Sequence, residues 1–485
     1  MSSLLVTAPL LGIIAMAMSL SYLVPIAVSV FYGDAMTRIF VLSMLVNFTF
    51  GLLLWLFTRH YKWEITARDS VLLVTLVWSG GALLASMPLL LALPGLSFTD
   101  AYFEAISGLT TTGATVLSNL DQLPPSLNIW RGLLQWLGGM GIIVLVVAIL
   151  PVLGVGGSQI FKTETPGPMK DTKLTPRIAE TAKGLWLIYF GLSAACMAAY
   201  QLAGMNAFDA LMHTFTTMST GGFSSYDASF GHFDSPLLEM ISAFFMILAA
   251  INFSSHFMAL RSRTPGTYAH DPEIRWLLTV VLGSCLGIGL YLFLAGVYPD
   301  FLTALRHATF NVVSVATSTG YATEDFNLWP VFAPLWMLFL VSFASCSGST
   351  GGGIKMVRAM ILYKQVYREF IRLLHPTAAA PMKIDGHPVE NKIVFSVLAF
   401  LFIYIVCIVA MTLILIASGL DVITAFSAVV ACINSLGPGL NQVGPATTFA
   451  ILNDFQIWIL SWAMLIGRLE LFTVLILFTP AFWRK

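Results

Sequence analysis

The chain has 485 residues, of which 58% are hydrophobic and only 10% are charged, and its mean hydropathy is +0.85. This composition excludes a soluble globular protein and indicates a polytopic membrane protein. The 24 acidic and 24 basic residues cancel, and the five cysteines lie in apolar surroundings without paired spacing, which argues against a disulfide framework and against a zinc site.

Ten apolar stretches are long enough to cross a hydrocarbon core of about 30 Å. The first lacks a basic N-terminal region and a small-residue cleavage site, so we interpret it as a spanning helix and not as a cleavable signal peptide. The predicted spans lie at 8–30, 37–58, 71–93, 130–153, 184–204, 236–260, 275–297, 330–361 (interrupted), 392–418 and 455–480.

The charged residues divide unequally between the two sides of the predicted membrane. With the loop 59–69 in the cytosol, twenty Lys and Arg lie on the inner side, and only Arg38, Arg131 and Arg306 lie on the outer side. The positive-inside rule then places both termini in the cytosol. Thirteen acidic residues lie outside against ten inside, so the outer face carries a net charge of −10 and would concentrate cations.

Four outer loops repeat one pattern, in which about ten residues of helical character end at a glycine in a context rich in Thr and Ser. They are "DAYFEAISGLTTTGATVL", "FDALMHTFTTMSTGGFSS", "LRHATFNVVSVATSTGYATEDF" and "DVITAFSAVVACINSLGPGLNQVGP", with glycines Gly113, Gly222, Gly320 and either Gly437 or Gly439. In three of the loops Asp100, Asp209 and Asp421 stand near the start of the half-helix, where we expect an N-cap acceptor.

This repeat predicts an all-α polytopic membrane protein, in which four repeats of span, re-entrant pore half-helix and span surround a central ion pore. One extra helix pair precedes them. The predicted units are 1–69 (helix pair), 70–180, 181–270, 271–388 (with an intramembrane gating loop at 345–354) and 389–485.

Re-entrant loops are tolerated at membrane depth only where protein surrounds them or where they line a water-filled cavity. Four such loops around one axis would make a pore. Glycine permits positive φ and close approach of the four chains to that axis, and a ring of oxygen atoms can replace the hydration shell of a cation.

Further motifs carry a family resemblance: "QWLGGMGIIVL" at 135–145, "GSTGGGIKMVR" at 348–358 and "IGRLELFTVL" at 466–475. Together with the glycine loops, they make essentially the whole chain resemble the Trk/Ktr/HKT superfamily of potassium transporters, most closely its bacterial members. The resemblance implies a potassium-selective filter with one glycine per repeat. In plant relatives a serine at the first filter position goes with sodium preference, so Gly113 implies potassium.

The candidate filter consists of these glycines and the residues just before them. In the fourth loop we prefer Gly439 over Gly437, because a hydrophobic residue follows Gly439, as one follows Gly222 and Gly320. The candidate potassium-binding residues are Thr111, Thr112, Gly113, Thr220, Gly221, Gly222, Ser318, Thr319, Gly320, Leu436, Gly437, Pro438 and Gly439.

The stretch "SCSGSTGGGIK" interrupts the predicted span 330–361. Glycines there would unwind the helix, and the freed backbone groups would need a cavity, water or a donor to satisfy them. The resemblance implies an intramembrane loop that obstructs the pore. The candidate gate residues are Cys346, Ser347, Gly348, Ser349, Thr350, Gly351, Gly352, Gly353, Lys355 and Arg468. Lys355 also fits an ordinary lysine at the cytosolic membrane edge.

Arg468 is the only basic residue predicted deep inside a span, where a charge is costly. A local pair with Glu470 is one alternative, but residues two apart on a helix point in different directions. We therefore expect the guanidinium to face the permeation path and to donate hydrogen bonds to exposed carbonyls. The glycines Gly138, Gly139 and Gly141 are expected to allow close helix packing.

No catalytic constellation indicates an enzyme. A phosphate-binding reading of "GSTGGGIK" is weak, because Ile354 separates the last glycine from Lys355 and Met356 replaces the Ser or Thr of that motif. Two transport mechanisms remain. We favour a channel for K⁺, because the repeats have parallel topology, over a secondary transporter that couples K⁺ to H⁺ or Na⁺.

The resemblance also implies partners. They are a second copy of the chain, in a homodimer, and a TrkA-like cytosolic ring subunit that binds ATP/ADP or NAD. The longest predicted cytosolic loop, 355–391, is too short to hold such a nucleotide-binding domain. The expected cargo is the potassium ion, and no organic cofactor is expected on this chain.

Overall fold

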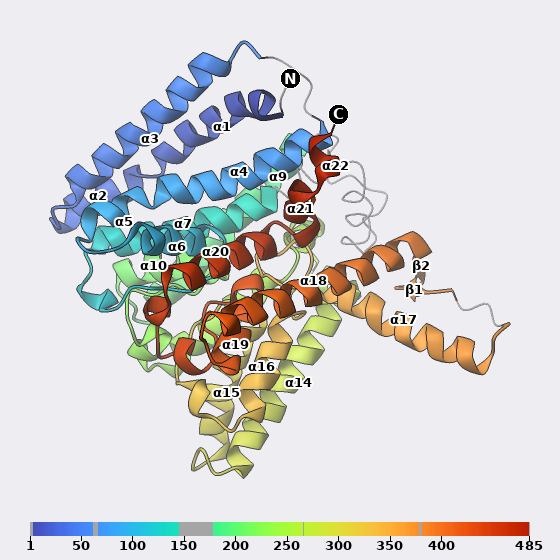
Figure 1. Ribbon diagram of the computed structural model, residues 1–485. Coiled ribbons are helices and arrows are strands. Elements are labelled where there is room, and N and C mark those ends of the chain that lie inside the picture. Colours follow the sequence, from blue (N-terminus) through green and yellow to red (C-terminus); the bar gives the residue numbers. More distant parts are fainter. Residues whose placement is uncertain (1–2, 62–65, 145–177, 265, 378–380, 485) are drawn as a thin grey trace.

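The computed structural model describes residues 3–61, 66–144, 178–264, 266–377 and 381–484. Both ends of the chain lie on the same side of the molecule (Figure 1). The α-helices up to the middle of the chain are α1 (Ser3–Leu20), α2 (Leu23–Tyr32), α3 (Thr37–Thr58), α4 (Ala67–Ala85), α5 (Met87–Ala92), α6 (Phe98–Leu109), α7 (Pro125–Val144), α9 (Ile178–Leu202), α10 (Ala207–Met218), α11 (Pro236–Ala250) and α12 (Phe253–Ser262).

The later elements include a two-stranded hairpin. The α-helices are α13 (Gly266–His270), α14 (Pro272–Leu294), α15 (Phe301–Ala316), α16 (Phe332–Val341), α17 (Met356–Leu374), α18 (Asn391–Ala417), α19 (Val422–Ile433), α20 (Asp454–Arg468), α21 (Leu471–Leu475) and α22 (Pro480–Trp483). Short 3₁₀ helices are η1 (Leu120–Gln122), η4 (Ser229–Phe233), η5 (Phe326–Leu328), η6 (Asn441–Val443), η7 (Phe449–Ile451) and η8 (Ile476–Phe478). The strands β1 (Lys383–Ile384) and β2 (His387–Pro388) pair antiparallel.

Within the described residues, six helical segments are long and apolar enough to cross a membrane: Leu4–Tyr32, Thr37–Thr58, Arg68–Ala92, Ala182–Leu202, Pro272–Leu294 and Asn391–Ala417. Large apolar side chains stay on their outer surfaces, as on Leu202, which is 90% exposed. A lipid environment explains this exposure, because apolar side chains meet no water there. The end of the predicted span 130–153, after residue 144, lies outside the described residues.

Two segments that the sequence predicts as continuous spans are bent. α11 and α12 meet at 96°, and α20 meets the segment Leu471–Phe478 at 117°. The first break falls at Asn252, whose side chain caps α12, and the second at Glu470, whose φ is 60°. The arrangement of ten spans and the unit boundaries thus remain predictions.

Four short helices, α6, α10, α15 and α19, occupy equivalent places inside the longer ones. α6 contacts α4 and α7, which flank it in sequence, and also α20. In the same way α10 contacts α9, α11 and α7; α15 contacts α14, α16 and α11; and α19 contacts α18, α20 and α16. Each short helix therefore packs against the long helices before and after it in sequence. It also packs against the long helix that follows the previous short helix, and the contact of α6 with α20 closes this cycle.

The first turns of the short helices are capped, but only partly by the predicted residues. The N-caps are Ser97, Asn206, Asp300 and Asp421, and each accepts a hydrogen bond from a backbone amide of the first turn. Asp100 and Asp209 lie three residues after their caps, so only the prediction for Asp421 is correct. Carboxylates inside the first turn still interact favourably with the helix dipole.

Glycines of α7 allow close packing, as predicted for Gly138 and Gly139. A Cβ atom at Gly138 would lie 1.9 Å from the carbonyl oxygen of Leu109, and one at Gly139 would lie 2.8 Å from the hydroxyl of Tyr189. At Gly141 the nearest atom, on Trp78, would be 3.5 Å away, which is an ordinary contact. The five cysteines are all free and buried.

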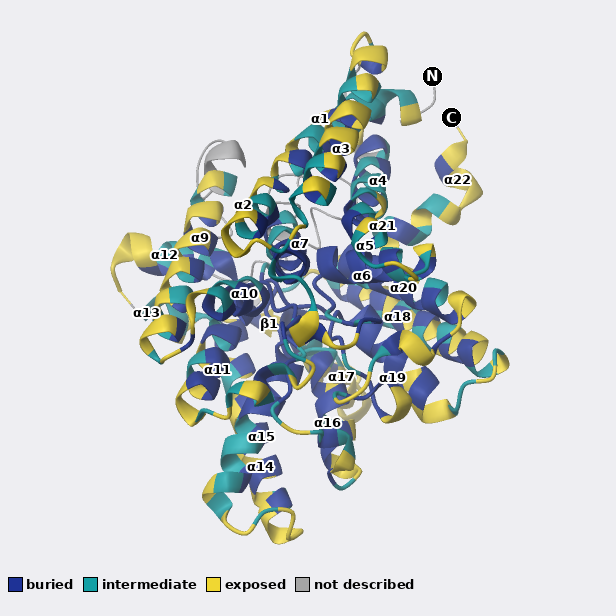
Figure 2. Cartoon of the chain, turned by 90° about the vertical axis from the view of Figure 1, so that its left-hand side faces the viewer, coloured by how far each residue is buried: buried dark blue, intermediate teal, exposed yellow. Residues whose placement is uncertain are grey.

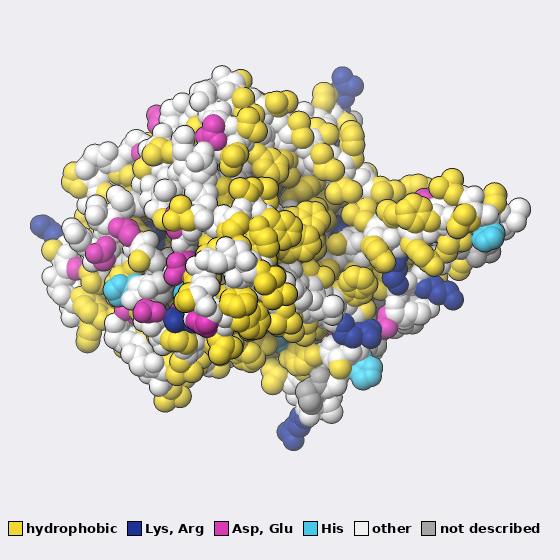
Figure 3. All heavy atoms as spheres, turned by 90° about the horizontal axis from the view of Figure 1, so that it is seen from below, with side chains coloured by type: hydrophobic (Ala, Val, Ile, Leu, Met, Phe, Trp, Pro, Cys, Tyr) yellow, Lys and Arg dark blue, Asp and Glu magenta, His cyan; other side chains and the backbone are white. Residues whose placement is uncertain are grey.

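Burial and charge follow the arrangement of the helices. Figure 2 shows buried residues gathered around the centre of the molecule and exposed ones on the outer helices and loops. In Figure 3, Asp and Glu gather toward the end opposite α17, whereas most of the visible Lys and Arg lie toward α17. α17 and the β1–β2 hairpin extend beyond the helical body (Figure 1), and this hairpin was not predicted by the all-α assignment.

Candidate functional site

Each short helix ends in the same backbone turn. The second residue after the helix has a φ between 52° and 58°: Thr111, Thr220, Ser318 and Ser435. The amide of the following residue donates to the carbonyl five residues earlier: Thr112 to Ser107, Gly221 to Thr216 and Thr319 to Ser314, each at 2.8 Å, and Leu436 to Ala431 at 2.9 Å. One residue later comes a glycine with a φ between 77° and 94°: Gly113, Gly222, Gly320 and Gly437.

The four glycines, here called the glycine ring, lie against one another in a closed cycle. A Cβ atom at Gly113 would be 2.0 Å from the carbonyl oxygen of Gly221, and one at Gly222 would be 2.0 Å from that of Thr319. At Gly320 the Cβ atom would be 1.9 Å from the carbonyl oxygen of Leu436, and at Gly437 it would be 2.9 Å from that of Thr112. We call these four acceptors, from Thr112, Gly221, Thr319 and Leu436, the ring carbonyls.

The fourth member of the ring is Gly437, whereas the sequence pattern favours Gly439 for the fourth filter position. Gly439 does not have a positive φ, and its amide donates to Val443 at 2.7 Å. A Cβ atom at Gly439 would meet the side chains of Val443 and Ser427 and no residue of another turn. Whether a glycine belongs to the ring depends on the turn that precedes it and not on a hydrophobic residue that follows it.

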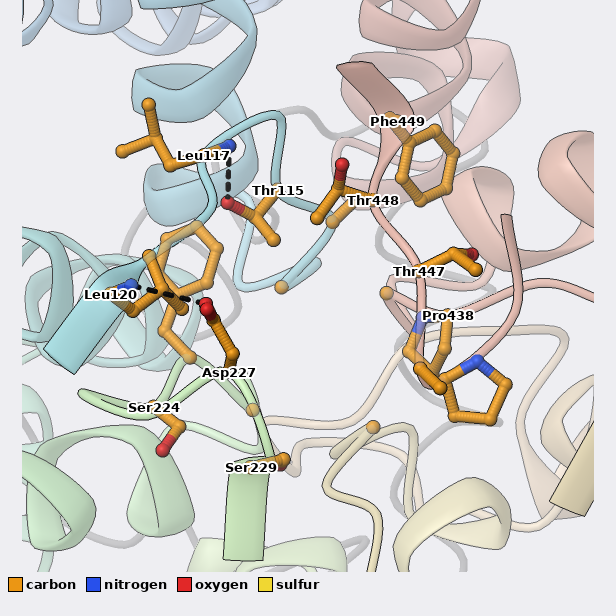
Figure 4. A pocket seen from close by; sticks show the side chains of 18 of the residues that line it. Thr115, Leu117, Leu120, Ser224, Asp227, Ser229, Pro438, Thr447, Thr448 and Phe449 are labelled. Atoms are coloured by element: carbon orange, nitrogen blue, oxygen red, sulfur yellow. Dashed lines mark hydrogen bonds between the residues drawn. The ribbon is translucent and has the colours of Figure 1, made fainter. Parts of the chain in front are cut away.

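A cavity of about 220 Å³ opens on the side of the ring formed by residues that follow the glycines (Figure 4). Asp227 lines this cavity, and its carboxylate is directed toward Leu120, accepting hydrogen bonds from the amides of Asn119 at 2.8 Å and Leu120 at 3.1 Å (Figure 4). Across the cavity, Figure 4 shows Thr447 and Thr448 of the fourth unit. Polar residues from the first, second and fourth units therefore line the cavity on this side of the ring.

Tyr226, which also lines the cavity, keeps its proton. Burial, followed by the neighbouring carboxylate of Asp209, raises the pKa of Tyr226 to about 12. Its hydroxyl donates to Asp209 at 2.9 Å, and Ser225 donates to the same carboxylate at 3.1 Å. The segment that follows Gly222 is thus bound to the first turn of α10.

A buried ion pair supports the first turn. Arg131 of α7 donates from Nε to Glu104 of α6 at 2.8 Å, and both side chains are buried. Glu104 also accepts from Thr115 at 3.0 Å and from the amide of Val116 at 3.1 Å, while Arg131 donates to the carbonyl of Ser224 at 3.1 Å. The pair therefore joins the segments that follow Gly113 and Gly222.

The stretch 345–355, here called the glycine-rich loop, lies against the other side of the turns. The amide of Gly352 donates to Ser318 Oγ at 2.9 Å, and Thr220 Oγ1 donates to Thr350 Oγ1 at 3.3 Å. A Cβ atom at Gly352 would be 2.0 Å from the carbonyl oxygen of Asn434. Small residues are required because the loop packs directly on three of the four turns.

In the other two turns, the hydroxyls at the equivalent position have no hydrogen-bond partner among the described residues. Thr111 and Ser435 occupy the positions of Thr220 and Ser318 in the other two turns, and their side-chain oxygens are buried without a hydrogen bond in the part of the chain that the structure describes. Buried polar atoms are usually paired.

Arg468, at the end of α20, contacts the glycine-rich loop. Its guanidinium donates to the carbonyl of Thr350 at 2.8 Å and to that of Gly138 at 3.5 Å. Glu470 instead pairs with Arg358 at 3.2 Å, so the local pair between Arg468 and Glu470 does not form. Lys355 donates to the carbonyl of Gly351 within the loop.

Glu273, in the first turn of α14, joins the start of the glycine-rich loop to the first turn of α17, and it was missed by sequence reasoning. One carboxylate oxygen accepts from the amide of Ser347 at 2.7 Å and from the amide of Val357 at 3.1 Å. Glu273 is buried, and it lies 74 residues before Ser347. Neither spacing nor a local motif could indicate this contact, which depends on tertiary packing.

The loop does not have the geometry of a phosphate-binding loop. It follows the helix α16, whereas that motif requires a preceding strand. Several of its amides already donate to protein acceptors: Cys346 to Ala250 at 2.9 Å, Ser347 to Glu273 and Gly352 to Ser318. Within the described residues, no group of three or more His, Cys, Asp and Glu could hold a metal ion.

Comparisons with known proteins agree with the whole-chain resemblance. A family model described as "TrkH: Cation transport protein" matches residues 37–485. The Trk system potassium uptake protein TrkH of Halomonas elongata is 46% identical over 478 residues, which are 98% of each chain, and TrkG of Escherichia coli K12 is 37% identical over 98% of this chain and 97% of its own. The crystal structure of the potassium transporter TrkH from Vibrio parahaemolyticus superposes with a TM-score of 0.92 at 42% identity, covering 100% of both chains.

Proposed function

We propose, from the premise that this chain belongs to the TrkH family of cation transport proteins, that it takes up potassium across the bacterial cytoplasmic membrane. Two similar proteins, from Halomonas elongata and Escherichia coli, are named potassium uptake proteins. The protein would perform no covalent chemistry. Its task is to offer oxygen atoms that replace the hydration shell of K⁺ along a path through the membrane.

The closed glycine ring is the observation that carries this proposal. Four equivalent turns place four backbone carbonyls around one centre, and each glycine leaves room for the carbonyl of the next turn. The short helices end at these turns, so the negative ends of their dipoles favour a cation there. The ring and the turn residues before it are the proposed selectivity filter, with Gly437 as the fourth glycine.

The glycine-rich loop is the proposed gate. It packs on the turns of the second, third and fourth units, and Arg468 and Glu273 hold it from two different helices. A cation that leaves the ring on this side would meet both the loop and the guanidinium of Arg468. Conduction therefore requires that the loop moves away from the turns.

Regulation is proposed to come from partners. The described segment between α16 and α18 contains the glycine-rich loop, α17 and a hairpin of two-residue strands, which together form no nucleotide-binding domain. We infer a homodimer that is opened by a cytosolic subunit binding ATP/ADP or NAD. Both termini and α17 would face the cytosol, in agreement with the basic side chains toward α17 in Figure 3.

Planar bilayer recordings of the purified protein test the mechanism. With K⁺ and proton gradients set in opposite directions, a channel gives a reversal potential at the K⁺ equilibrium value. A reversal potential that shifts with pH, or with Na⁺ at constant K⁺, would instead show coupled transport. The same recording with and without the cytosolic subunit measures its effect on opening.

A further inference from the structure

One of the four turns differs from the others at the residue before the ring glycine. The first, third and fourth turns have Thr112, Thr319 and Leu436 there, whereas the second has Gly221. A Cβ atom at Gly221 would lie 2.4 Å from Cδ of Gln135, which is a side chain of α7. Gln135 therefore occupies the space that a side chain fills in the other turns.

Gln135 also makes two hydrogen bonds to this turn. Its Nε2 donates to the carbonyl oxygen of Gly221 at 2.7 Å, and its Oε1 accepts from the amide of Phe223 at 3.1 Å. The two bonds bracket Gly222, the ring glycine of the second unit. Gln135 is fully buried, so both ends of its amide are satisfied by the backbone of the turn.

The acceptor of the first bond is a ring carbonyl. Within the described residues, the other three ring carbonyls, from Thr112, Thr319 and Leu436, accept no hydrogen bond from the protein. A carbonyl that accepts an N–H shares its electron density with that donor, and the positive end of the donor opposes a nearby cation. The ring therefore has three free carbonyls and one weakened carbonyl.

The position of Gln135 is apolar in two other units. Gln135 is the residue ten positions after the start of α7. The residues ten positions after the starts of α11 and α20 are Met246 and Met464. All three side chains are fully buried. A polar side chain here is not required for packing, because methionine has a similar volume.

We propose that Gln135 is a specificity-determining residue, which weakens one ring carbonyl and fixes its position, and so lowers the attraction of the ring for small cations. The inference rests on the proposed filter function of the ring. Ligands of high field strength favour Na⁺ over K⁺, so a ring with one weakened carbonyl favours K⁺. Removing the donor frees the Gly221 carbonyl and strengthens the field.

The test is the permeability ratio of K⁺ to Na⁺ for Gln135→Met, measured from reversal potentials of the full-length protein in bilayers. We expect the ratio to fall roughly fivefold, as for the loss of one net hydrogen bond, while K⁺ current is kept. The matched control is Met246→Leu, which changes the packing of a buried side chain at the corresponding position of α11. An unchanged ratio in Gln135→Met overturns the proposal.

A paired substitution separates specificity from folding. Gly221→Thr should abolish transport, because its side chain collides with Gln135, whereas Gln135→Ala with Gly221→Thr should restore transport with a lowered ratio. Restored transport at the wild-type ratio, or no rescue in a folded double variant, contradicts the role of Gln135. If Gly113→Ser alters the ratio but the Gln135 variants do not, the filter stands and this inference fails.

Discussion

The guanidinium of Arg468 donates a hydrogen bond of 2.8 Å to the carbonyl oxygen of Thr350 and so ties α20 to the glycine-rich loop. The same side chain reaches the carbonyl of Gly138 on α7. Arg468 is buried, and both of its acceptors are backbone carbonyls, one in the glycine-rich loop and one in α7. This contact would both hold the loop and oppose a cation on its way through.

Arg468→Ala should therefore raise potassium flux. A hydrogen bond to a charged group contributes about 1.5–3 kcal/mol, so the population with a displaced loop should rise by roughly tenfold or more. Flux is measured as rubidium uptake into vesicles that contain the purified protein, normalised to the folded protein. Arg38→Ala, which removes an exposed arginine, is the control, and flux equal to wild type in Arg468→Ala would remove Arg468 from the gate.

Glu273→Ala should loosen the start of the glycine-rich loop and the first turn of α17. The substitution leaves the amides of Ser347 and Val357 without their acceptor, at a cost of about 1–3 kcal/mol for each buried group. Cys346, which is buried beside Ser347, reports the movement through its rate of maleimide labelling in a variant that lacks the other four cysteines. We expect faster labelling in Glu273→Ala and a smaller change in Glu273→Gln, which keeps one acceptor oxygen. Equal labelling rates in all three proteins would show that Glu273 does not hold the loop.

Gly437→Ala and Gly439→Ala distinguish the two glycines of the fourth loop. Gly437 has a φ of 94°, and a Cβ atom there would lie 2.9 Å from the Thr112 carbonyl, so the substitution should disturb the ring and lower the permeability ratio of K⁺ to Na⁺. At Gly439 the three atoms nearest to the new methyl group belong to Val443 and Ser427, which lie outside the ring, so the ratio should change less than in Gly437→Ala. The reverse result in bilayer recordings would return the fourth filter position to Gly439.

Arg131→Met should destabilise the whole protein, because it leaves the Glu104 carboxylate buried without its cationic partner. Breaking a buried pair in this way typically costs about 3–5 kcal/mol, whereas replacing both partners costs less. Thermal unfolding in detergent should therefore show a lower Tm for Arg131→Met than for Glu104→Gln with Arg131→Met. A single variant that melts at the wild-type temperature would show that the pair does not support the fold.

The sequence predicted the four turns because they repeat with glycine and small polar residues, and the structure places these turns in one ring. It could not choose between Gly437 and Gly439, since the choice depends on where α19 ends. In every unit the ring glycine follows the last residue of its short helix by four positions, as Gly437 follows Ile433. Helix ends are the least certain feature of a sequence-based prediction.

The contacts of Gln135 and Glu273 could not be predicted from the sequence for a different reason. Gln135 reaches Gly221 over 86 residues, and Glu273 reaches Val357 over 84 residues. Gln135 opens the stretch "QWLGGMGIIVL" and Glu273 lies outside the motifs, but in both cases a single buried Gln or Glu in an apolar helix does not identify its partner. Their partners are revealed only by the packing of α7 against α10 and of α14 against α17.

The central claim is that the glycine ring selects potassium, and the reversal potential of Gly113→Ser under bi-ionic K⁺ and Na⁺ conditions tests it most directly. Gly113 has a φ of 82°, and any side chain there meets the Gly221 carbonyl, so the ring must change shape. We predict that the wild-type protein reverses near the K⁺ equilibrium potential and that the reversal potential of Gly113→Ser shifts toward that of Na⁺. A folded, conducting Gly113→Ser protein with the wild-type reversal potential would contradict the account.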